Sequence, residues 1–377
     1  MLASTFQCVL RFGLIMAFLA VGASTALAHP PWGIVVSSTG IVYFSDLETV
    51  WKIDRDGKTS VFRAGAGGRH VHELSIDDQD NLYGPVEVYE ASTEKYLIGV
   101  WRMTPDGKET QLQHPIDIVM SGVSIWRDRA GNMYSVDQNN HKKKRTLLLR
   151  RTPSGIVSTL AGGAYGHKDG KGTAAKFGSV SAMTIASDGS IYLTDALSVR
   201  RISLDGTVTT VATNLAARTS EDKPTLFGGV DASIMGLAVG YDGQVYVADA
   251  GNRRLLKIGG KASVVYRVDP PYFPTGVFAT RSGDVYVLEF SYTPPGTTNN
   301  PRVRKISSDG ENKLITTGPA GTNSNVAPPG SLPRARFANI LGFVNTRGWF
   351  FVLGIVGVLI TAATLVWRRR RHGTQRA

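Results

Sequence analysis

One short pattern recurs six times along this chain and constrains its fold more than any other feature. Each copy places a tyrosine after an apolar residue, and most copies close on an acidic residue, as in GQVYVAD, which ends at Asp249. Alternation of apolar and polar residues predicts a short strand in every copy. A chain of repeated β units buries its apolar faces by packing one unit against the next. The tyrosines of the six copies are Tyr43, Tyr83, Tyr134, Tyr192, Tyr246 and Tyr286.

The spacing of the copies predicts the architecture. Successive tyrosines lie 40, 51, 58, 54 and 40 residues apart, and a four-stranded propeller blade takes about 40 to 50 residues. A turn marker such as Asp56-Gly57 or Asp205-Gly206 follows each copy, with Gly259-Gly260 in the fifth, and glycine supplies the positive φ of a tight hairpin. We therefore predict an all-β, six-bladed β-propeller over residues 29–318. We also expect an inner strand after Pro31 and an end blade completed from both termini.

Two stretches resemble the NHL repeat. One is VADAGNRRLLKI at residues 247–258, and the other is LAGGAYGHKDGKGTAAKFGS at residues 160–179. The second is similar to the glycine-rich connection that precedes a blade in many bacterial NHL proteins. The resemblance covers residues 30–318 and implies a six-bladed propeller. Blade number alone also relates the chain to the gluconolactonase and strictosidine-synthase-like propellers, which implies a fold and no chemistry.

Both ends of the chain carry patterns typical of membrane targeting. Residues 1–28 hold Arg11, an apolar run and small residues ending at Ala28, which predicts a secretory signal peptide. Residues 347–367 include the uncharged run from Trp349 to Trp367, which is long enough for a transmembrane helix. Residues 319–346 are rich in Pro, Gly and Ser and are predicted to be a linker and juxtamembrane segment. The tail, 368–377, opens with Arg368, Arg369, Arg370 and Arg371 and is predicted to be cytoplasmic.

This topology places the propeller outside the cytoplasm, periplasmic or extracellular, on the cell membrane of a bacterium. The only cysteine, Cys8, lies in the signal, so we expect no disulfide in the mature protein. Seven of the 42 basic residues lie in the signal, beside the span or in the tail, which leaves 35 basic against 30 acidic residues elsewhere, a balance of +5. So mild an excess does not predict nucleic-acid binding.

One local run of positive charge stands apart from this mild balance. It consists of His141, Lys142, Lys143, Lys144 and Arg145, in an unusually long hairpin of the third blade. The run is interpreted either as a solvated loop or as a contact for an anionic partner such as a membrane surface or a polysaccharide.

The strongest signal for a ligand site is the sequence His70-Val71-His72-Glu73, just before the inner strand of the second blade. Alternation along a strand directs both histidines to one side, and imidazole and carboxylate groups suit zinc or a similar ion. Glu73 stands where other copies have a glycine, such as Gly33 or Gly276. A metal site needs another ligand, and the candidates are His114 and His167. The alternative is a hydrogen-bonded channel mouth without metal.

Other carboxylates recur once per blade, namely Asp46, Asp137, Asp195 and Asp249, and this regularity indicates a structural turn residue. Three classes of function remain open. The first is a non-enzymatic membrane-anchored module that binds a protein, peptide or glycan. The second is a metal-dependent hydrolase or lyase, gluconolactonase-like or amidating-lyase-like, with a divalent ion such as zinc or calcium at the rim. The third is a sensor that signals through the helix, which the short tail disfavours.

Overall fold

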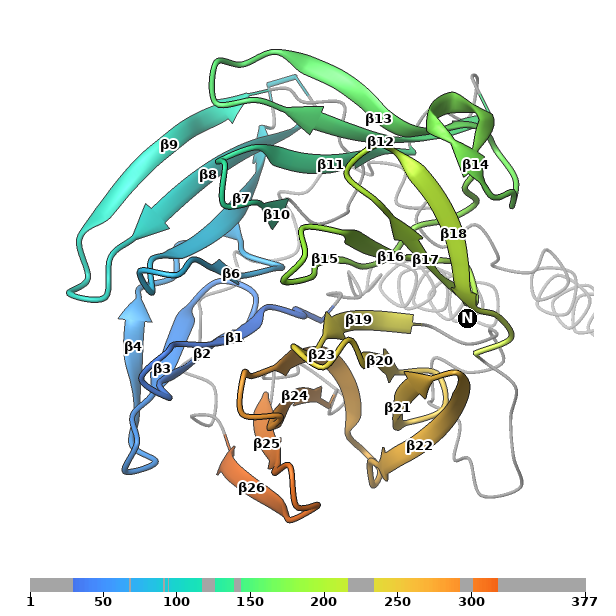
Figure 1. Ribbon diagram of the computed structural model, residues 1–377. Helices are drawn as coiled ribbons and strands as arrows, with labels where there is room; N and C mark the ends of the chain where they lie inside the picture. Colours follow the sequence, from blue (N-terminus) through green and yellow to red (C-terminus); the bar gives the residue numbers. More distant parts are fainter. Residues whose placement is uncertain are drawn as a thin grey trace, which may run out of the picture. The chain divides into compact units, whose positions relative to one another are not determined.

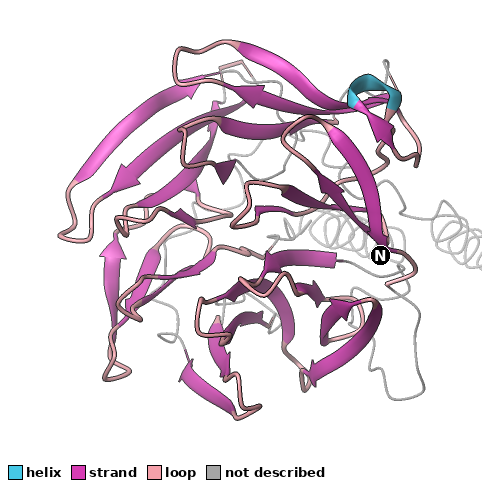
Figure 2. Cartoon of the chain, viewed as in Figure 1, coloured by secondary structure: helices cyan, strands magenta, loops and turns pink. Residues whose placement is uncertain are grey.

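Each repeat of the sequence forms one antiparallel sheet, because short alternating strands joined by tight turns pair with their neighbours along the chain. The computed structural model describes residues 30–67, 69–90, 92–93, 95–116, 126–138, 144–215, 234–291 and 301–317. Within these ranges six sheets, called blades 1 to 6, follow one another around an axis (Figure 1). Within these ranges all regular secondary structure is β-strand, apart from one 3-10 helical turn, η1, at Gly172–Ala174 (Figure 2). The predicted all-β six-bladed propeller is confirmed.

The strands of blades 1 to 3 follow chain order from the axis outward. Blade 1 contains β1 (Ile34–Val36), β2 (Val42–Ser45), β3 (Val50–Ile53) and β4 (Thr59–Arg63). Blade 2 contains β5 (Arg69–His70), β6 (Ser75–Ile76), β7 (Leu82–Glu90), β8 (Lys95–Met103) and β9 (Glu109–Ile116), and both β5 and β6 pair with β7. Blade 3 contains β10 (Trp126–Arg127), β11 (Met133–Asp137), β12 (Arg145–Arg151) and β13 (Val157–Ala164).

Blades 4 to 6 follow the same plan, with one addition in blade 4. There β14 (Gly170–Lys171) pairs with the outer strand, beyond β15 (Met183–Ile185), β16 (Ile191–Asp195), β17 (Ser198–Ile202) and β18 (Thr207–Ala212). Blade 5 contains β19 (Ile234–Val239), β20 (Val245–Asp249), β21 (Arg254–Gly259) and β22 (Lys261–Arg267). Blade 6 contains β23 (Phe273–Ala279), β24 (Val285–Phe290), β25 (Arg302–Ile306) and β26 (Asn312–Thr317).

The ring closes between blades 6 and 1 without an exchange of strands. In the described ranges both blades come from contiguous chain, so the expectation of an end blade completed from both termini is wrong. Side-chain packing closes the ring instead, through an apolar cluster that joins Phe44 of blade 1 to Leu288 of blade 6. The hydroxyls of Thr59 and Thr316 also lie 2.9 Å apart across this seam. The expected inner strand after Pro31 is present as β1.

The repeated tyrosines pack between blades. Tyr43 belongs to an apolar cluster with Leu74 and Trp101 of blade 2, and Tyr134 to one with Met183 of blade 4. Tyr192, Tyr246 and Tyr286 make the same kind of contact with the blade that follows them in the ring. For Tyr83 the contact is a cation–π one, with the Arg127 guanidinium of blade 3 at 5.2 Å from its ring centroid. Each tyrosine thus links its own sheet to the next one.

The second turn marker also has its predicted role. The hairpin between the last two strands of every blade turns at a glycine whose φ is between 80° and 95°, a region that side chains disfavour. These glycines are Gly57, Gly107, Gly155, Gly206, Gly260 and Gly310.

The predicted signal peptide, linker, span and tail lie outside the described residues. The chain divides into two compact units, Met1–Ser331 and Leu332–Ala377, and the propeller belongs to the first. In the part of the chain that the structure describes, no helix is long and apolar enough to cross a membrane.

Candidate functional site

The rim is defined here as the face of the propeller formed by the connections between blades and by the hairpins between the second and third strands. In five blades this hairpin starts at a carboxylate, and each carboxylate is bonded within its own blade. Asp195 and Asp249 are 1% and 0% exposed. The bonds run from Trp51 to Asp46, Arg145 to Asp137, Arg200 to Asp195, Arg254 to Asp249 and Arg302 to Glu289, at 2.5–3.1 Å. The structural role predicted for the repeated aspartates is confirmed.

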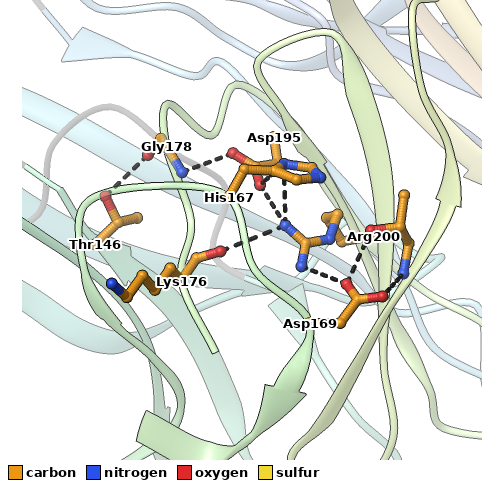
Figure 3. Close-up of polar contacts among 8 residues, drawn as sticks. Thr146, His167, Asp169, Lys176, Gly178, Asp195 and Arg200 are labelled. Atoms are coloured by element: carbon orange, nitrogen blue, oxygen red, sulfur yellow. Dashed lines mark hydrogen bonds and ion pairs between the residues drawn. The ribbon is translucent and has the colours of Figure 1, made fainter. Parts of the chain in front are cut away.

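In blade 4 the bond between the rim carboxylate and the arginine is part of a larger hydrogen-bond network that includes His167 (Figure 3). The Nη1 of Arg200 donates to Asp195 Oδ2 at 2.6 Å, and its Nη2 donates to Asp169 Oδ1 at 2.7 Å. Nδ1 of His167 lies 2.9 Å from the same Asp195 oxygen. Arg200 is fully buried, and two carboxylates offset the cost of burying its charge. The network fixes the connection between blades 3 and 4 onto blade 4.

His70 and His72 lie together where the chain enters blade 2. Val71 between them is fully buried and bridges to Leu47 of blade 1, so both histidines point to the other side of the strand. Their ring centroids are 5.6 Å apart in an edge-to-face arrangement. Nε2 of His72 lies 3.1 Å from Oε2 of Glu87, which is on β7. The two histidines thus lie on one side of the strand, as alternation predicts.

An indole ring completes this cluster. Trp32 precedes β1 and stacks on His72 with centroids 5.2 Å apart and planes 18° apart. The backbone N–H of Trp32 also donates to the carbonyl oxygen of His72 at 2.9 Å. We call Trp32, His70, His72 and Glu87 the rim cluster. It presents two imidazoles, an indole and a carboxylate at the junction of blades 1 and 2.

Burial sets the protonation state of His70. Loss of solvent, reinforced by the neighbouring His72, lowers the pKa of His70 to about 4, although Glu87 opposes the shift. His70 is therefore a neutral imidazole at neutral pH, with one nitrogen that donates and one that accepts a hydrogen bond.

Glu73 lies deeper, on the axis of the ring. It is 5% exposed and lines a cavity of about 20 Å³ with Trp32, Leu74, Met183, Leu237 and Val277. Such a volume holds about one water molecule. The inner strands converge here because glycine permits it: a Cβ on Gly236 would lie 2.7 Å from the Thr275 carbonyl oxygen.

The remaining predicted ligands lie elsewhere. His114 is exposed on β9, the outer strand of blade 2, and His167 lies between blades 3 and 4. Neither contacts the rim cluster in the described structure. Within the described ranges no three His, Cys, Asp or Glu side chains are grouped closely enough to hold one metal ion.

The predicted anionic-partner loop is described only at its end. Lys144 is exposed, and Arg145 is engaged by Asp137 at 3.1 Å. His141, Lys142 and Lys143 lie outside the described residues, as do Trp349, Trp367 and Arg368 to Arg371.

Sequence reasoning missed Trp32 and Glu87 as members of the rim cluster. A local signal existed for Trp32, which directly precedes the first inner strand in Pro31-Trp32-Gly33. Glu87 reaches the cluster only because β7 is nine residues long and pairs with β5 as well as β6.

Comparison with known proteins finds similarity only among solved structures. No family model matches the chain. No curated protein matches it either. Selenomethionine-substituted virginiamycin B lyase from Staphylococcus aureus is 17% identical, with a TM-score of 0.46 over 76% of this chain and 83% of that one. A putative gluconolactonase is 16% identical, with a TM-score of 0.39 over 62% and 77%.

A third similar structure is the PQQ-bound aldose sugar dehydrogenase from Streptomyces coelicolor, 11% identical, with a TM-score of 0.45 over 73% of this chain and 93% of that one. Likeness at such identities assigns neither a family nor an activity to this chain. The resemblance to NHL repeats stays a prediction.

Proposed function

We propose that this protein is a non-enzymatic binding module, held outside the cytoplasm by its C-terminal span, whose rim binds a protein, peptide or glycan. One observation carries the proposal: the rim cluster presents stacked aromatic rings beside a carboxylate at a junction between blades. Aromatic rings give a large contact area at low conformational cost, and the neighbouring polar atoms orient a ligand. The repeated rim carboxylates contribute to hairpin structure, since Arg and Trp side chains engage them.

An array of extracytoplasmic glycans and peptides tests this proposal with the full-length protein. We expect at least one class of ligand to be retained by the wild type and lost with Trp32→Ala and with His70→Gln. Tyr241→Ala is the matched control, because this tyrosine is 49% exposed in a turn on the face opposite the rim. No retained ligand, or retention that depends on Tyr241 and not on Trp32, would contradict the proposal.

A second candidate is a metal-dependent hydrolase or lyase at His70, His72 and Glu73. The 5.6 Å separation of the two imidazole rings supplies two ligands of such a site, because neighbouring histidines are common zinc ligands, but the described residues do not group a third ligand with them. Metal analysis of the purified full-length protein separates the two candidates. Stoichiometric zinc or calcium that is lost with His72→Ala would support the enzyme, and a protein that stays metal-free after incubation with each ion would exclude it.

A further inference from the structure

The connection between blades 3 and 4, residues 164–179, presents an ordered surface on the rim. The N–H of Gly166 donates to the Phe177 carbonyl oxygen at 3.1 Å, and Phe177 is fully buried. Beneath the loop, Arg200 bonds both Asp195 and Asp169, and Asp169 accepts two hydrogen bonds from Thr210 at 2.8 and 3.0 Å. The loop is therefore held in one conformation by its own backbone and by blade 4.

Two lysines face each other in this braced loop. Lys168 and Lys176 exchange backbone hydrogen bonds of 3.0 and 3.1 Å, so they are directly opposite in an antiparallel bridge. Side chains of such a pair lie on the same side, and like charges there repel. Both lysines are exposed, and in the described residues neither forms an ion pair. In Figure 3 the Lys176 side chain extends away from Arg200, whereas its carbonyl oxygen faces the guanidinium.

A third lysine and a tyrosine adjoin the start of this loop through a backbone contact. The N–H of Tyr165 donates to the carbonyl oxygen of Lys144 at 2.7 Å, and Arg145 pairs with Ala164. Tyr165 is 62% exposed. This contact brings the end of the basic hairpin of blade 3 next to the braced loop. Arg145 engages Asp137, and Arg200 engages Asp169 and Asp195, so the carboxylates of this region do not neutralise the lysines.

The arrangement fits a repeating anionic carbohydrate. Ammonium groups make charge-assisted hydrogen bonds to carboxylates, and lysine imposes no bidentate geometry on them. An exposed tyrosine ring offers an apolar face to the C–H groups of a sugar ring and a hydroxyl to its edge. The backbone fixes the spacing of the lysine pair, which matches a polymer with regularly spaced charges better than a fluid lipid surface. An anion between the lysines would also relieve their repulsion.

We propose that Lys144, Lys168, Lys176 and Tyr165 bind the uronate residues of an acidic polysaccharide. This inference rests on the proposed ligand-binding role of the rim and gives that role a chemical class of ligand. It also names a place on the rim, between blades 3 and 4, that is separate from the rim cluster.

Binding of polygalacturonate to the full-length protein tests the inference. At about 150 mM salt, we expect the double variant Lys168→Gln/Lys176→Gln to bind about tenfold more weakly than the wild type, since two charge contacts are lost. The melting temperature should stay at or above the wild-type value, because a like-charge repulsion is removed. Lys58→Gln/Lys261→Gln is the matched control: both lysines are exposed at hairpins on the opposite face, and affinity should not change.

Three further ligands define the outcomes. Fully methyl-esterified polygalacturonate keeps the sugar and loses the charge, so equal binding of it would overturn the proposal. Polyglutamate keeps the charge and lacks the sugar ring. Tyr165→Ala should therefore weaken binding of polygalacturonate and leave binding of polyglutamate unchanged. Equal loss of binding for both polymers would overturn the carbohydrate assignment. Vesicles of phosphatidylglycerol and phosphatidylcholine at 1:3, if bound while polygalacturonate is not, would assign the lysines to a membrane surface instead.

The array and the polygalacturonate measurements together distinguish a failure of this inference from a failure of the proposed function. If array ligands are lost with Trp32→Ala and polygalacturonate fails to bind, the rim remains a binding face and the acidic-polysaccharide site is wrong. If polygalacturonate binds and the lysine variant loses it, the site stands whatever the rim cluster binds.

Discussion

At the scale of single residues, the carboxylate that closes the second strand of a blade determines how the rim is built. Asp195 is the clearest case, because it accepts hydrogen bonds from Arg200 and from the Gly178 N–H, at 2.6 and 2.7 Å, and is nearly inaccessible to solvent. Removing one member of a buried ion pair leaves the other charge without compensation. These aspartates therefore contribute mainly to stability.

Asp195→Ala should lower the free energy of unfolding by about 3 kcal/mol, the lower end of the usual cost when a buried pair loses one partner, because Arg200 keeps its bond to Asp169. Urea denaturation followed by tryptophan fluorescence measures the change. Asp205→Ala is the control: its pair with Lys171 is exposed on both sides, so the expected loss is below about 1 kcal/mol. Equal losses in the two variants would show that burial does not determine the cost.

His70 predicts a dependence of stability on pH. Its pKa is about 4 in the folded protein and about 6.5 in an unfolded chain, so below pH 6.5 the unfolded state binds the proton first. With a chelator present to remove metal ions, lowering the pH from 7 to 5 should reduce the free energy of unfolding of the wild type by about 1–2 kcal/mol more than that of His70→Gln. Urea titrations at the two pH values provide the comparison, and parallel losses would contradict it.

At the scale of elements, the inner strands determine how closely the blades approach the axis. A Cβ on Gly276 of β23 would overlap the carbonyl oxygen of Trp32, and one on Gly33 would lie 3.0 Å from atoms of Glu73 and Leu74. Because this contact joins blade 6 to the segment before blade 1, it bears directly on ring closure. The rim cluster depends on it, since the same Trp32 stacks on His72.

Gly276→Ala should therefore lower the free energy of unfolding by about 1–3 kcal/mol, the usual cost of overpacking. It should also change the fluorescence of Trp32, whose backbone must move. Gly67→Ala is the matched control, because a Cβ there meets no atom within 4 Å. Thermal and urea unfolding of both variants measure the difference, and a stable Gly276→Ala with unchanged fluorescence would refute the close approach.

At the scale of the whole molecule, the six blades use chain from residue 34 to residue 317 in order. The seam between blades 6 and 1 holds through packing and the Thr59–Thr316 contact. The predicted span follows the last strand of blade 6, so we expect the propeller to fold without it.

A chain that ends at residue 318 should keep the melting temperature of the full-length protein within about 3 °C. It should leave the membrane fraction, whereas the full-length protein should remain there after a carbonate wash. Cell fractionation and circular dichroism test both halves of this prediction. A truncated protein that does not fold would show that residues 319–377 contribute to the ring.

The sequence by itself determined the blade number, the turn glycines and the structural role of the repeated aspartates. These features are local or periodic, so spacing and turn chemistry reveal them. Only the tertiary structure decided which distant residues meet. Trp32 stacks on His72, Glu87 reaches the same histidine, and Lys144 lies beside Tyr165. It also decided that His114 and His167 stay apart from His70, and that the ring closes without strand exchange. Such contacts depend on how neighbouring blades pack around the axis, and no pattern within one repeat encodes that.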